Sequence, residues 1–467
     1  MLEAPPEVRS QTAAEYDKWR RRGRYYHDRI TANCRFHVAA GARVLELGCG
    51  NGDLLAAVRP ARGVGIDLSA EMVACAQRRH PELEFLCLDA QGFQLDERFD
   101  YIVLSNVLHE VQDVQAVLAN LPHVCHERTR ILIHNYNYLW EPVLRAASRL
   151  GLRRPVPCQN WLDFHDVANL LEITGFRVIR RQMRMLLPKR IPLVSDLVNR
   201  YLAVLPLVDR LCLVQCIVAA PQPKARDPQT MSCSVVIPTK DERGNIADAI
   251  RRTPRMGRHT EFLFVDGHST DGTIAEIQRA IAENPELDIR WMLQDGKGKG
   301  DAVRKAFAAA KGDVLMILDS DLTMPPEELP KYFDALAQGH GEFVNGCRLV
   351  YQLEKQSMRF LNILANKAFA LLFCWLLEQR VKDTLCGTKV LCRADYERIA
   401  ANRHYFGDFD PFGDFDLLFG AAKLNLKIVE IPIRYQARTY GEIKIRRFQH
   451  GLLLLRMCVF AFRKLKV

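Results

Sequence analysis

Short apolar segments alternate with amphipathic helical patterns along the chain. In the first half, strands are predicted at residues 42–49, 63–67, 83–89, 99–106 and 130–135. Strands that are apolar along nearly their whole length, with helices between them, are typical of a parallel sheet covered on both faces. After a predicted helix at 164–174, the segments 176–182 and 211–220 could close this sheet as a late antiparallel pair.

The second half repeats this pattern with different sequences. Strands are predicted at residues 232–239, 261–267, 288–293, 313–321 and 342–347, and helices at 246–252, 271–284 and 300–310. We therefore predict an α/β chain of two doubly wound domains, a Rossmann-like domain followed by a second nucleotide-binding type of domain.

The predicted boundary is a segment without periodicity. Residues 221–231 read PQPKARDPQTM, with three prolines and mixed charge, which is typical of a linker. The expected domains are therefore residues 1–220 and 232–467, and 467 residues are about right for two domains.

Composition narrows the class of protein. Hydrophobic residues make up 48% and charged residues 26%, which excludes a disordered chain, a collagen and a coiled coil. The 65 Lys and Arg outnumber the 55 Asp and Glu by ten, so anionic partners such as nucleotide phosphates or lipid headgroups are favoured. These cations are scattered, so no nucleic-acid partner is expected.

Cysteine usage and hydropathy indicate the compartment. None of the 14 Cys forms a CxxC pair, so we expect reduced thiols in a cytoplasmic protein, with neither a zinc site nor a disulfide framework. The first ten residues lack the apolar core of a signal peptide. No segment offers about 18 uninterrupted apolar residues for a membrane span.

Surface attachment to the membrane stays open. The segments 358–377 and 450–467 are apolar and end in or contain cations, which suits interfacial helices at the cytoplasmic membrane face. The alternatives are packing against a sheet or a dimer contact. A third apolar stretch, 191–214, could be an acceptor lid, a domain contact or plain core.

The first candidate site is a glycine loop directly after a predicted strand. Residues 45–53 read LELGCGNGD, with Gly48, Gly50 and Gly52 at a spacing of two. Glycines there allow a sharp turn and the close approach of a ligand. The dinucleotide fingerprint GxGxxG places its third glycine one position later, so this spacing argues against a nicotinamide cofactor.

Two acids end the next two predicted strands. Asp67 lies where an acid binds ribose hydroxyls, and Asp89 could accept a hydrogen bond from an adenine amino group. Either acid alone could be a cap or a solvated turn, but open α/β sheets bind ligands at these strand ends.

Residues 40–220 resemble the class I S-adenosylmethionine-dependent methyltransferases in this loop and these acids. The resemblance implies S-adenosyl-L-methionine as cofactor, with Glu46 ordering the loop and the methionine amine, Asp67 on the ribose, and Asp89 and Ala90 on the adenine. The implied cofactor-binding residues are Glu46, Gly48, Gly50, Gly52, Asp67, Asp89, Ala90 and Ser105. His109 is the candidate catalytic base, with His134 and Tyr136 as further candidates, although each could also have a packing role.

The second candidate site is a pair of aspartates after a predicted strand. Asp319 and Asp321 lie two residues apart in DVLMILDSDL, so their carboxylates emerge on one side and repel each other without a cation. Mg²⁺ prefers one or two carboxylates together with phosphate oxygens, so a metal-bridged diphosphate fits this pair.

The motifs around this pair resemble glycosyltransferase family 2, which has the GT-A fold. They are SVVIPTKDERGNI from Ser234, EFLFVDGHSTDGT from Glu261, GKGKGDAVRKAF from Gly296 and the aspartate pair. The implied donor-binding residues are Pro238, Glu242, Asp266, Lys299, Arg304 and Asp319, and the implied ligands of Mg²⁺ or Mn²⁺ are Asp319 and Asp321. Gly267 departs from the family, since many members have an aspartate there, so recognition of UDP or GDP stays open.

Two later segments resemble the dolichyl-phosphate glucosyltransferases and related polyprenyl-phosphate glycosyltransferases. They are KDTLCGTKVLCR from Lys382 and FGDFDLLF from Phe412. The resemblance places Asp414 and Asp416 near the acceptor as candidate catalytic residues. It assigns Arg348, Lys389, Arg438 and Lys444 to the acceptor or to phosphates.

These observations predict a bifunctional enzyme. One half would carry out inverting, metal-dependent transfer from a nucleotide-sugar to polyprenyl phosphate or to a glycan or lipid intermediate, and the other half methyl transfer. An ionised phosphate acceptor needs no strong base, whereas a hydroxyl acceptor would need Asp414 or Asp416. The alternative is a glycosyltransferase whose first domain is a non-catalytic scaffold.

Overall fold

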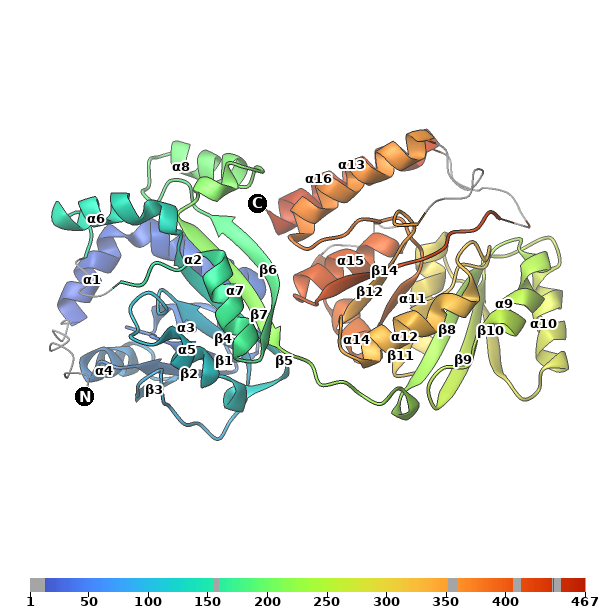
Figure 1. Ribbon diagram of the computed structural model, residues 1–467, viewed down its shortest axis with the longest axis horizontal. Coiled ribbons are helices and arrows are strands. Elements are labelled where there is room, and N and C mark those ends of the chain that lie inside the picture. The colour runs from blue at the N-terminus through green and yellow to red at the C-terminus, as the bar shows by residue number, and fades with distance from the viewer. Residues whose placement is uncertain are drawn as a thin grey trace. The chain divides into compact units, whose positions relative to one another are not determined.

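The chain forms two compact units, residues Met1–Gln222 and Pro223–Val467 (Figure 1). The computed structural model describes residues 13–154, 159–351, 360–405, 413–438, 440 and 447–466. Each unit is built around a seven-stranded sheet within these residues. This arrangement confirms the predicted α/β fold class.

In the first unit the strands lie in the order β3-β2-β1-β4-β5-β7-β6. They are β1 (Arg43–Leu47), β2 (Arg62–Asp67), β3 (Glu84–Cys87), β4 (Phe99–Ser105), β5 (Cys125–Tyr136), β6 (Phe176–Arg184) and β7 (Val214–Pro221). The first five strands are parallel, and β7 is antiparallel to both β5 and β6, which confirms the predicted late antiparallel pair.

Strand alternation explains why helices cover both faces of this sheet. Along β1, Val44 faces one side and Leu45 the other, and each joins a separate buried cluster. The helices are α1 (Ala13–Arg22), α2 (Arg24–His37), α3 (Asp53–Ala57), α4 (Ala70–Arg79), α5 (Val114–Ala119), α6 (Glu141–Arg149), α7 (Phe164–Ile173) and α8 (Val194–Leu197). Helices α2, α3 and α4 contribute to the Val44 cluster, and α5 and α7 to the Leu45 cluster.

The second unit has the strand order β10-β9-β8-β11-β13-β12-β14. These strands are β8 (Ser232–Thr239), β9 (His259–Asp266), β10 (Asp288–Leu293), β11 (Val314–Ile317), β12 (Phe343–Cys347), β13 (Lys389–Cys392) and β14 (Ile428–Pro432). Strands β10, β9, β8 and β11 are parallel, so their carboxyl ends share one edge, while β13 is antiparallel to its neighbours β11 and β12.

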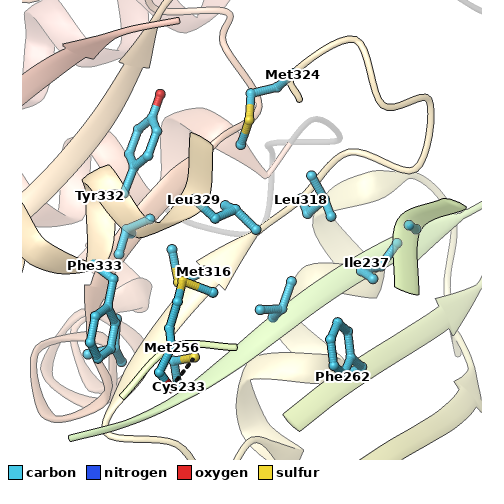
Figure 2. Packing of buried hydrophobic residues seen from close by; sticks show 14 of the residues in the cluster. Cys233, Ile237, Met256, Phe262, Met316, Leu318, Met324, Leu329, Tyr332 and Phe333 are labelled. Atoms are coloured by element: carbon cyan, nitrogen blue, oxygen red, sulfur yellow. Dashed lines mark hydrogen bonds between the residues drawn. The ribbon is translucent and has the colours of Figure 1, made fainter. Parts of the chain in front are cut away.

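Helices cover both faces of the second sheet as well. They are α9 (Ile246–Arg252), α10 (Thr273–Glu283), α11 (Lys299–Ala309), α12 (Leu329–Ala337), α13 (Phe360–Leu377), α14 (Arg393–Ala401), α15 (Asp414–Lys423) and α16 (Arg447–Leu465). Helices α9, α10 and α12 pack with inward side chains of β8, β9 and β11, and Figure 2 shows this cluster from Phe262 to Phe333. Helix α11 packs against β8 and β9, where Val236 and Leu263 are fully buried.

No helix in the described part of the chain is both long and apolar enough to cross a membrane.

Core packing in the second unit leads to a stability prediction. Phe262 is 1% exposed, so Phe262→Ala should lower the free energy of unfolding of the second unit by about 3–5 kcal/mol through lost burial and a new cavity. Urea denaturation followed by circular dichroism measures the change. Leu293→Ala, at a side chain that is 39% exposed, is the control and should cost about 0.5 kcal/mol or less. Equal effects of the two substitutions would contradict the assigned core.

Candidate functional sites

The glycine loop of the first unit connects β1 to α3 and has no room for side chains. Gly48, Gly50 and Gly52 have φ values of +67°, +54° and +75°, in the left-handed region. A Cβ on Gly48 would lie 2.5 Å from Val107 Cγ2, and one on Gly50 would lie 2.7 Å from Tyr16 Oη. The loop can therefore pack against Val107 and Tyr16 only because these positions are glycine.

Asp67 holds this loop against the end of β2. Its carboxylate accepts hydrogen bonds from the backbone N–H groups of Gly50, at 2.8 Å, and Ser69, at 2.9 Å. Asp89 follows β3, the next strand of the sheet, and is exposed, accepting a 2.9 Å bond from the backbone of Gln91. Ala90 beside it is half-buried. The two acids thus lie at the carboxyl ends of adjacent strands, with Asp67 in contact with the loop.

Glu46 is a buried carboxyl group directly before the loop. It is 3% exposed, and its Oε2 has no hydrogen-bond partner among the described residues. Burial raises the pKa of Glu46 to about 8, although nearby Arg20 opposes this shift. A cation placed beside Glu46 would be strongly favoured, because it would compensate the carboxylate in a place that water does not reach.

Helix α1 covers the loop and was not predicted. Arg20 pairs with Asp53 of α3 at 3.1 Å, and Asp17 pairs with Arg79 of α4. The Tyr16 ring lies against Gly50, and burial raises the pKa of its hydroxyl. The periodicity of AAEYDKWRRR could have indicated this helix, but nothing in the sequence indicates which loop it covers.

The end of β4 leads into a second polar cluster. Ser105 and Asn106 are half-buried, and Asn106, with φ at +62°, accepts a 2.6 Å hydrogen bond from the Tyr26 hydroxyl of α2. The backbone N–H of Asn106 donates to the carbonyl of His134 at 2.9 Å. These contacts place β4, β5 and α2 side by side at the carboxyl edge of the sheet.

His109 and His134 lie near this edge in different surroundings. The His109 ring is 3% exposed, its centroid lies 4.8 Å from that of Tyr136, and its Nδ1 has no partner among the described residues. Burial and the charges of Arg153 and Arg154 lower the pKa of His109 to about 3. His134 bonds to Asn33 at 2.9 Å, and burial lowers its pKa to about 4. Both rings are therefore neutral at pH 7.

In the second unit, each candidate metal ligand is paired with a cation. Asp319 follows β11 and pairs with Lys299 at 2.6 Å. Asp321 pairs with Arg438 at 2.7 Å, and the same guanidinium donates to Glu242 at 3.0 Å. The cluster thus brings together three carboxylates and two cations from segments up to about 200 residues apart in the sequence.

Nearby cations stabilise the ionised form of Asp319. Burial disfavours its ionisation, but Lys299, Lys389 and Arg348 together hold the pKa of Asp319 below its usual value. Lys389 is fully buried and donates to the carbonyl of Cys386. Arg348 forms two bonds to Asp383, at 2.7 and 2.8 Å.

Glycines let two segments approach this cluster. A Cβ on Gly387 would overlap the Asp319 carboxylate and the Lys299 amine, so the segment before β13 fits there only with glycine. A Cβ on Gly413 would lie 2.5 Å from the Cα of Gly300 at the start of α11. The segments after residues 382 and 412 therefore meet at the aspartate cluster.

Asp266 and Pro238 lie at the ends of neighbouring strands. Asp266 is fully buried and accepts bonds from the Ser269 hydroxyl at 2.6 Å and the Thr239 hydroxyl at 3.2 Å. Pro238 is half-buried in β8 opposite Val265. Gly267 is half-buried, and a Cβ there would lie 3.3 Å from Lys240 Cδ.

Arg304 and Asp416 belong to a different part of the second unit. Arg304 lines a cavity of about 360 Å³ together with Arg393 and Arg403. Asp416 is 7% exposed and pairs with Arg403 at 3.0 Å. The Asp414 side chain and Lys444 lie outside the described residues.

The carboxylates of Asp319 and Asp321 would bind a hard divalent cation only together with further oxygen ligands from a substrate. Within the described ranges, no group of three or more His, Cys, Asp or Glu side chains is placed to hold a metal ion. Two carboxylates alone are what Mg²⁺ uses when substrate phosphates complete its shell. The pair of Asp319 and Asp321 meets that requirement.

Comparison with known families agrees with this geometry. Residues 16–181 match the family model described as a methyltransferase domain, and residues 234–397 match the model for glycosyl transferase family 2. The chain combines a methyltransferase domain with a family 2 glycosyltransferase domain. The methyltransferase domain contains the glycine loop, and the glycosyltransferase domain contains the aspartate cluster.

Relatives extend the comparison for each domain. The glycosyltransferase half is 29% identical over 221 residues to a dolichol-phosphate mannosyltransferase from Pyrococcus furiosus, covering 46% of this chain and 60% of that protein. It is 27% identical to an undecaprenyl-phosphate 4-deoxy-4-formamido-L-arabinose transferase from Edwardsiella ictaluri, covering 48% and 64%. The chain thus spans less than two thirds of these relatives.

An S-adenosylmethionine-dependent methyltransferase from Mesorhizobium loti is similar at 17% identity and a TM-score of 0.33, covering 40% of this chain and 96% of that one.

The contact at Gly387 leads to a prediction for the glycosyltransferase domain. Gly387→Ala should lower sugar transfer from a nucleotide-sugar by at least about 100-fold, because the new Cβ displaces Asp319 or Lys299. Initial rates measured by mass spectrometry test this. Gly92→Ala is the control, since no atom lies within 4 Å of a Cβ there, and it should keep the parent rate. A fully active Gly387→Ala enzyme would contradict the described approach.

The buried Glu46 leads to a prediction about pH. Because its folded-state pKa is about 8 and its ordinary value 4.5, the folded methyltransferase domain keeps a proton that the unfolded chain has released. This contribution to stability is fully present below pH 4.5 and is lost as pH rises to about 8. Between pH 6.5 and 8, above the ordinary pKa of the buried His109 and His134, urea midpoints should fall for the parent, and Glu46→Gln should remove that fall. Glu71→Gln, at an exposed position, should keep it, and an unchanged slope in Glu46→Gln would contradict the assignment.

Proposed function

We propose that the chain is a bifunctional transferase. Its second unit transfers a glycosyl group from a nucleotide-sugar to polyprenyl phosphate in a divalent-metal-dependent, inverting displacement, and its first unit transfers a methyl group from S-adenosylmethionine. The observation that carries the first assignment is the aspartate pair, with one cation held on each carboxylate. The names of the curated relatives support a polyprenyl phosphate as acceptor.

Asp319 and Asp321 would hold Mg²⁺ or Mn²⁺. When bound, this ion would neutralise the diphosphate and stabilise the negative charge of the leaving nucleotide. Lys299 and Arg438, which pair with these carboxylates in the absence of the ion, would then be available to bind phosphate oxygens. Arg438 also contacts Glu242, which joins the segment after β8 to the same cluster.

A phosphate acceptor agrees with the state of Asp416. This carboxylate is held by Arg403 and is nearly buried, an arrangement unsuited to taking a proton from a hydroxyl. A phosphate oxygen is already ionised at pH 7 and attacks the anomeric carbon without a base. The half-buried Arg348 and the buried Lys389 would increase the positive potential that such an acceptor meets.

The first unit fits a sulfonium cofactor that carries an amine. The buried Glu46, whose Oε2 has no partner among the described residues, directly precedes the glycine loop, so a positive charge would be favoured there. Asp67 and Asp89, at the end of β2 and after β3, would accept hydrogen bonds from the nucleoside. His109 is neutral and weakly basic, so it would orient the acceptor or accept a proton only from an acidic one.

Substitution of the aspartates tests the glycosyl transfer. Asp319→Asn and Asp321→Asn should each lower transfer to undecaprenyl phosphate by at least about 100-fold and remove its dependence on Mn²⁺. UDP- and GDP-sugars are screened with and without S-adenosylmethionine, and products are read by mass spectrometry. The matched control is Asp334→Asn on the exposed side of α12, which should keep the parent rate.

Full transfer in the presence of a chelator, or in both variants, would overturn the metal-dependent mechanism. Calorimetry with S-adenosylmethionine tests the other half. Absence of binding in a folded protein would instead favour the scaffold alternative for the first unit.

A further inference from the structure

The methyltransferase domain carries a large exposed apolar surface, which we name the cap. It consists of residues 138–152, containing the short turn η2 (Tyr138–Trp140) and α6, and residues 191–211, containing α8, η3 (Val198–Leu202) and η4 (Asp209–Leu211). Of the 24 large hydrophobic side chains exposed in the described part of the chain, 14 belong to the cap. They are Tyr138, Leu139, Val143, Leu150, Leu152, Ile191, Leu193, Val194, Leu197, Tyr201, Leu202, Leu205, Leu207 and Leu211.

Hydrogen bonds join the two segments of the cap. The Trp140 indole donates to the carbonyl of Leu211 at 2.8 Å, and the Asn137 amide donates to the carbonyl of Arg210 at 2.9 Å. Helix α6 has no fully buried residue: its Leu144 packs at the edge of the Val44 cluster, whereas the neighbouring Val143 is 54% exposed. Figure 1 shows α6 and α8 at the same end of the domain.

Two leucines of the cap have an unusual backbone. Leu193 and Leu207 have φ values of +62° and +73°, which are rare for a bulky side chain, and they are 80% and 70% exposed. Strained positions of this kind persist where surrounding contacts hold them, and they cluster at binding surfaces. Both leucine side chains are thus exposed to solvent at backbone positions where glycine or asparagine is the usual residue.

Charge around the cap has one dominant sign. Four cations of the cap are exposed, namely Arg145, Arg149, Arg200 and Arg210, and the exposed Lys189 and Arg190 directly precede its second segment. Among its three acids, only Asp196 is exposed, and it accepts a bond from the Tyr25 hydroxyl. Leucines that enter the acyl boundary beside arginines that meet headgroup phosphates are typical of interfacial membrane binding.

A protein partner of the same sign is disfavoured as the occupant. Helix α16 in the glycosyltransferase domain also exposes Leu452, Leu455 and Val459 beside Arg456 and Arg463. Two basic surfaces repel each other, whereas each complements an anionic bilayer. A second copy of the cap would meet the same repulsion.

We propose that the cap docks the methyltransferase domain on an anionic phospholipid membrane. The cap begins directly after β5, whose last residue, Tyr136, lies beside His109 and under the guanidinium of Arg153, 4.9 Å from its ring centroid. The candidate methyl-transfer residues His109 and Tyr136 therefore lie close to the start of the cap. Resting on the proposed methyl transfer, this position makes the methyl acceptor a lipid-anchored molecule rather than a free metabolite.

Hydrogen exchange on the full chain tests the docking without any activity. Vesicles of phosphatidylglycerol should slow exchange in residues 138–152 and 191–211, and vesicles of phosphatidylcholine alone should not. Vesicle co-sedimentation of the double variant Leu193→Asp with Leu207→Asp should show an affinity lower by at least about tenfold. Ile173→Asp, at a 60% exposed position on α7 outside the cap, is the matched control and should bind as the parent does.

Equal exchange with and without anionic vesicles would overturn the proposal, and so would unchanged affinity of the double variant. Slow exchange in the cap before any vesicle is added would also overturn it, since the second unit or another copy would then cover the surface. Because binding is measured without cofactor or donor, these outcomes are independent of whether either transferase activity is found.

Discussion

The compensation of carboxylates at the carboxyl edge of a parallel sheet is the constraint on which the second unit depends. Strands β8 and β11 end beside each other, so Glu242, Asp319 and Asp321 would repel without nearby cations. Lys299 from α11 and Arg438 from near the end of the chain supply these cations. A divalent ion and a diphosphate could replace them in the same place, which links the packing of the domain to its proposed chemistry.

In the first unit, a buried carboxyl group is stabilised by keeping its proton and not by an ion pair. Glu46 lies at the equivalent edge, but burial raises its pKa to about 8, so it keeps its proton at neutral pH instead of a full counter-charge. Arg20 lowers this pKa but forms its ion pair with Asp53. In the second unit, a metal and a diphosphate could replace the partners in the ion pairs of Asp319 and Asp321. In the first unit, a cationic ligand would favour ionisation of Glu46.

Sequence reasoning predicted the elements whose signals are local. The glycine spacing before α3, the aspartates after β11 and the strand–helix alternation all depend on neighbours within a few residues, and the fold class followed from them. The sequence did not reveal Arg438 between Glu242 and Asp321, because these contacts span 196 and 117 residues. Strands β13 and β14 were not predicted, because both strands are short and β13 lies inside a segment that was interpreted from its motif.

Some site residues could be assigned only from the fold. Gly387 is an ordinary glycine in the sequence, and its role appears only where its Cα meets Asp319. Arg304 lies five residues along α11 from Lys299 and lines a cavity with Arg393 and Arg403. Helical periodicity could have separated these two faces of α11, but no sequence signal shows what packs against each.

The most direct measurement of the central claim is a crystal structure with Mn²⁺ and a nucleoside diphosphate, with the metal located by its anomalous scattering. The account predicts manganese bound by Asp319 and Asp321, with Lys299 and Arg438 moved from the carboxylates to the phosphates. Manganese elsewhere, with the Arg438–Asp321 and Lys299–Asp319 pairs intact beside a bound diphosphate, would contradict it.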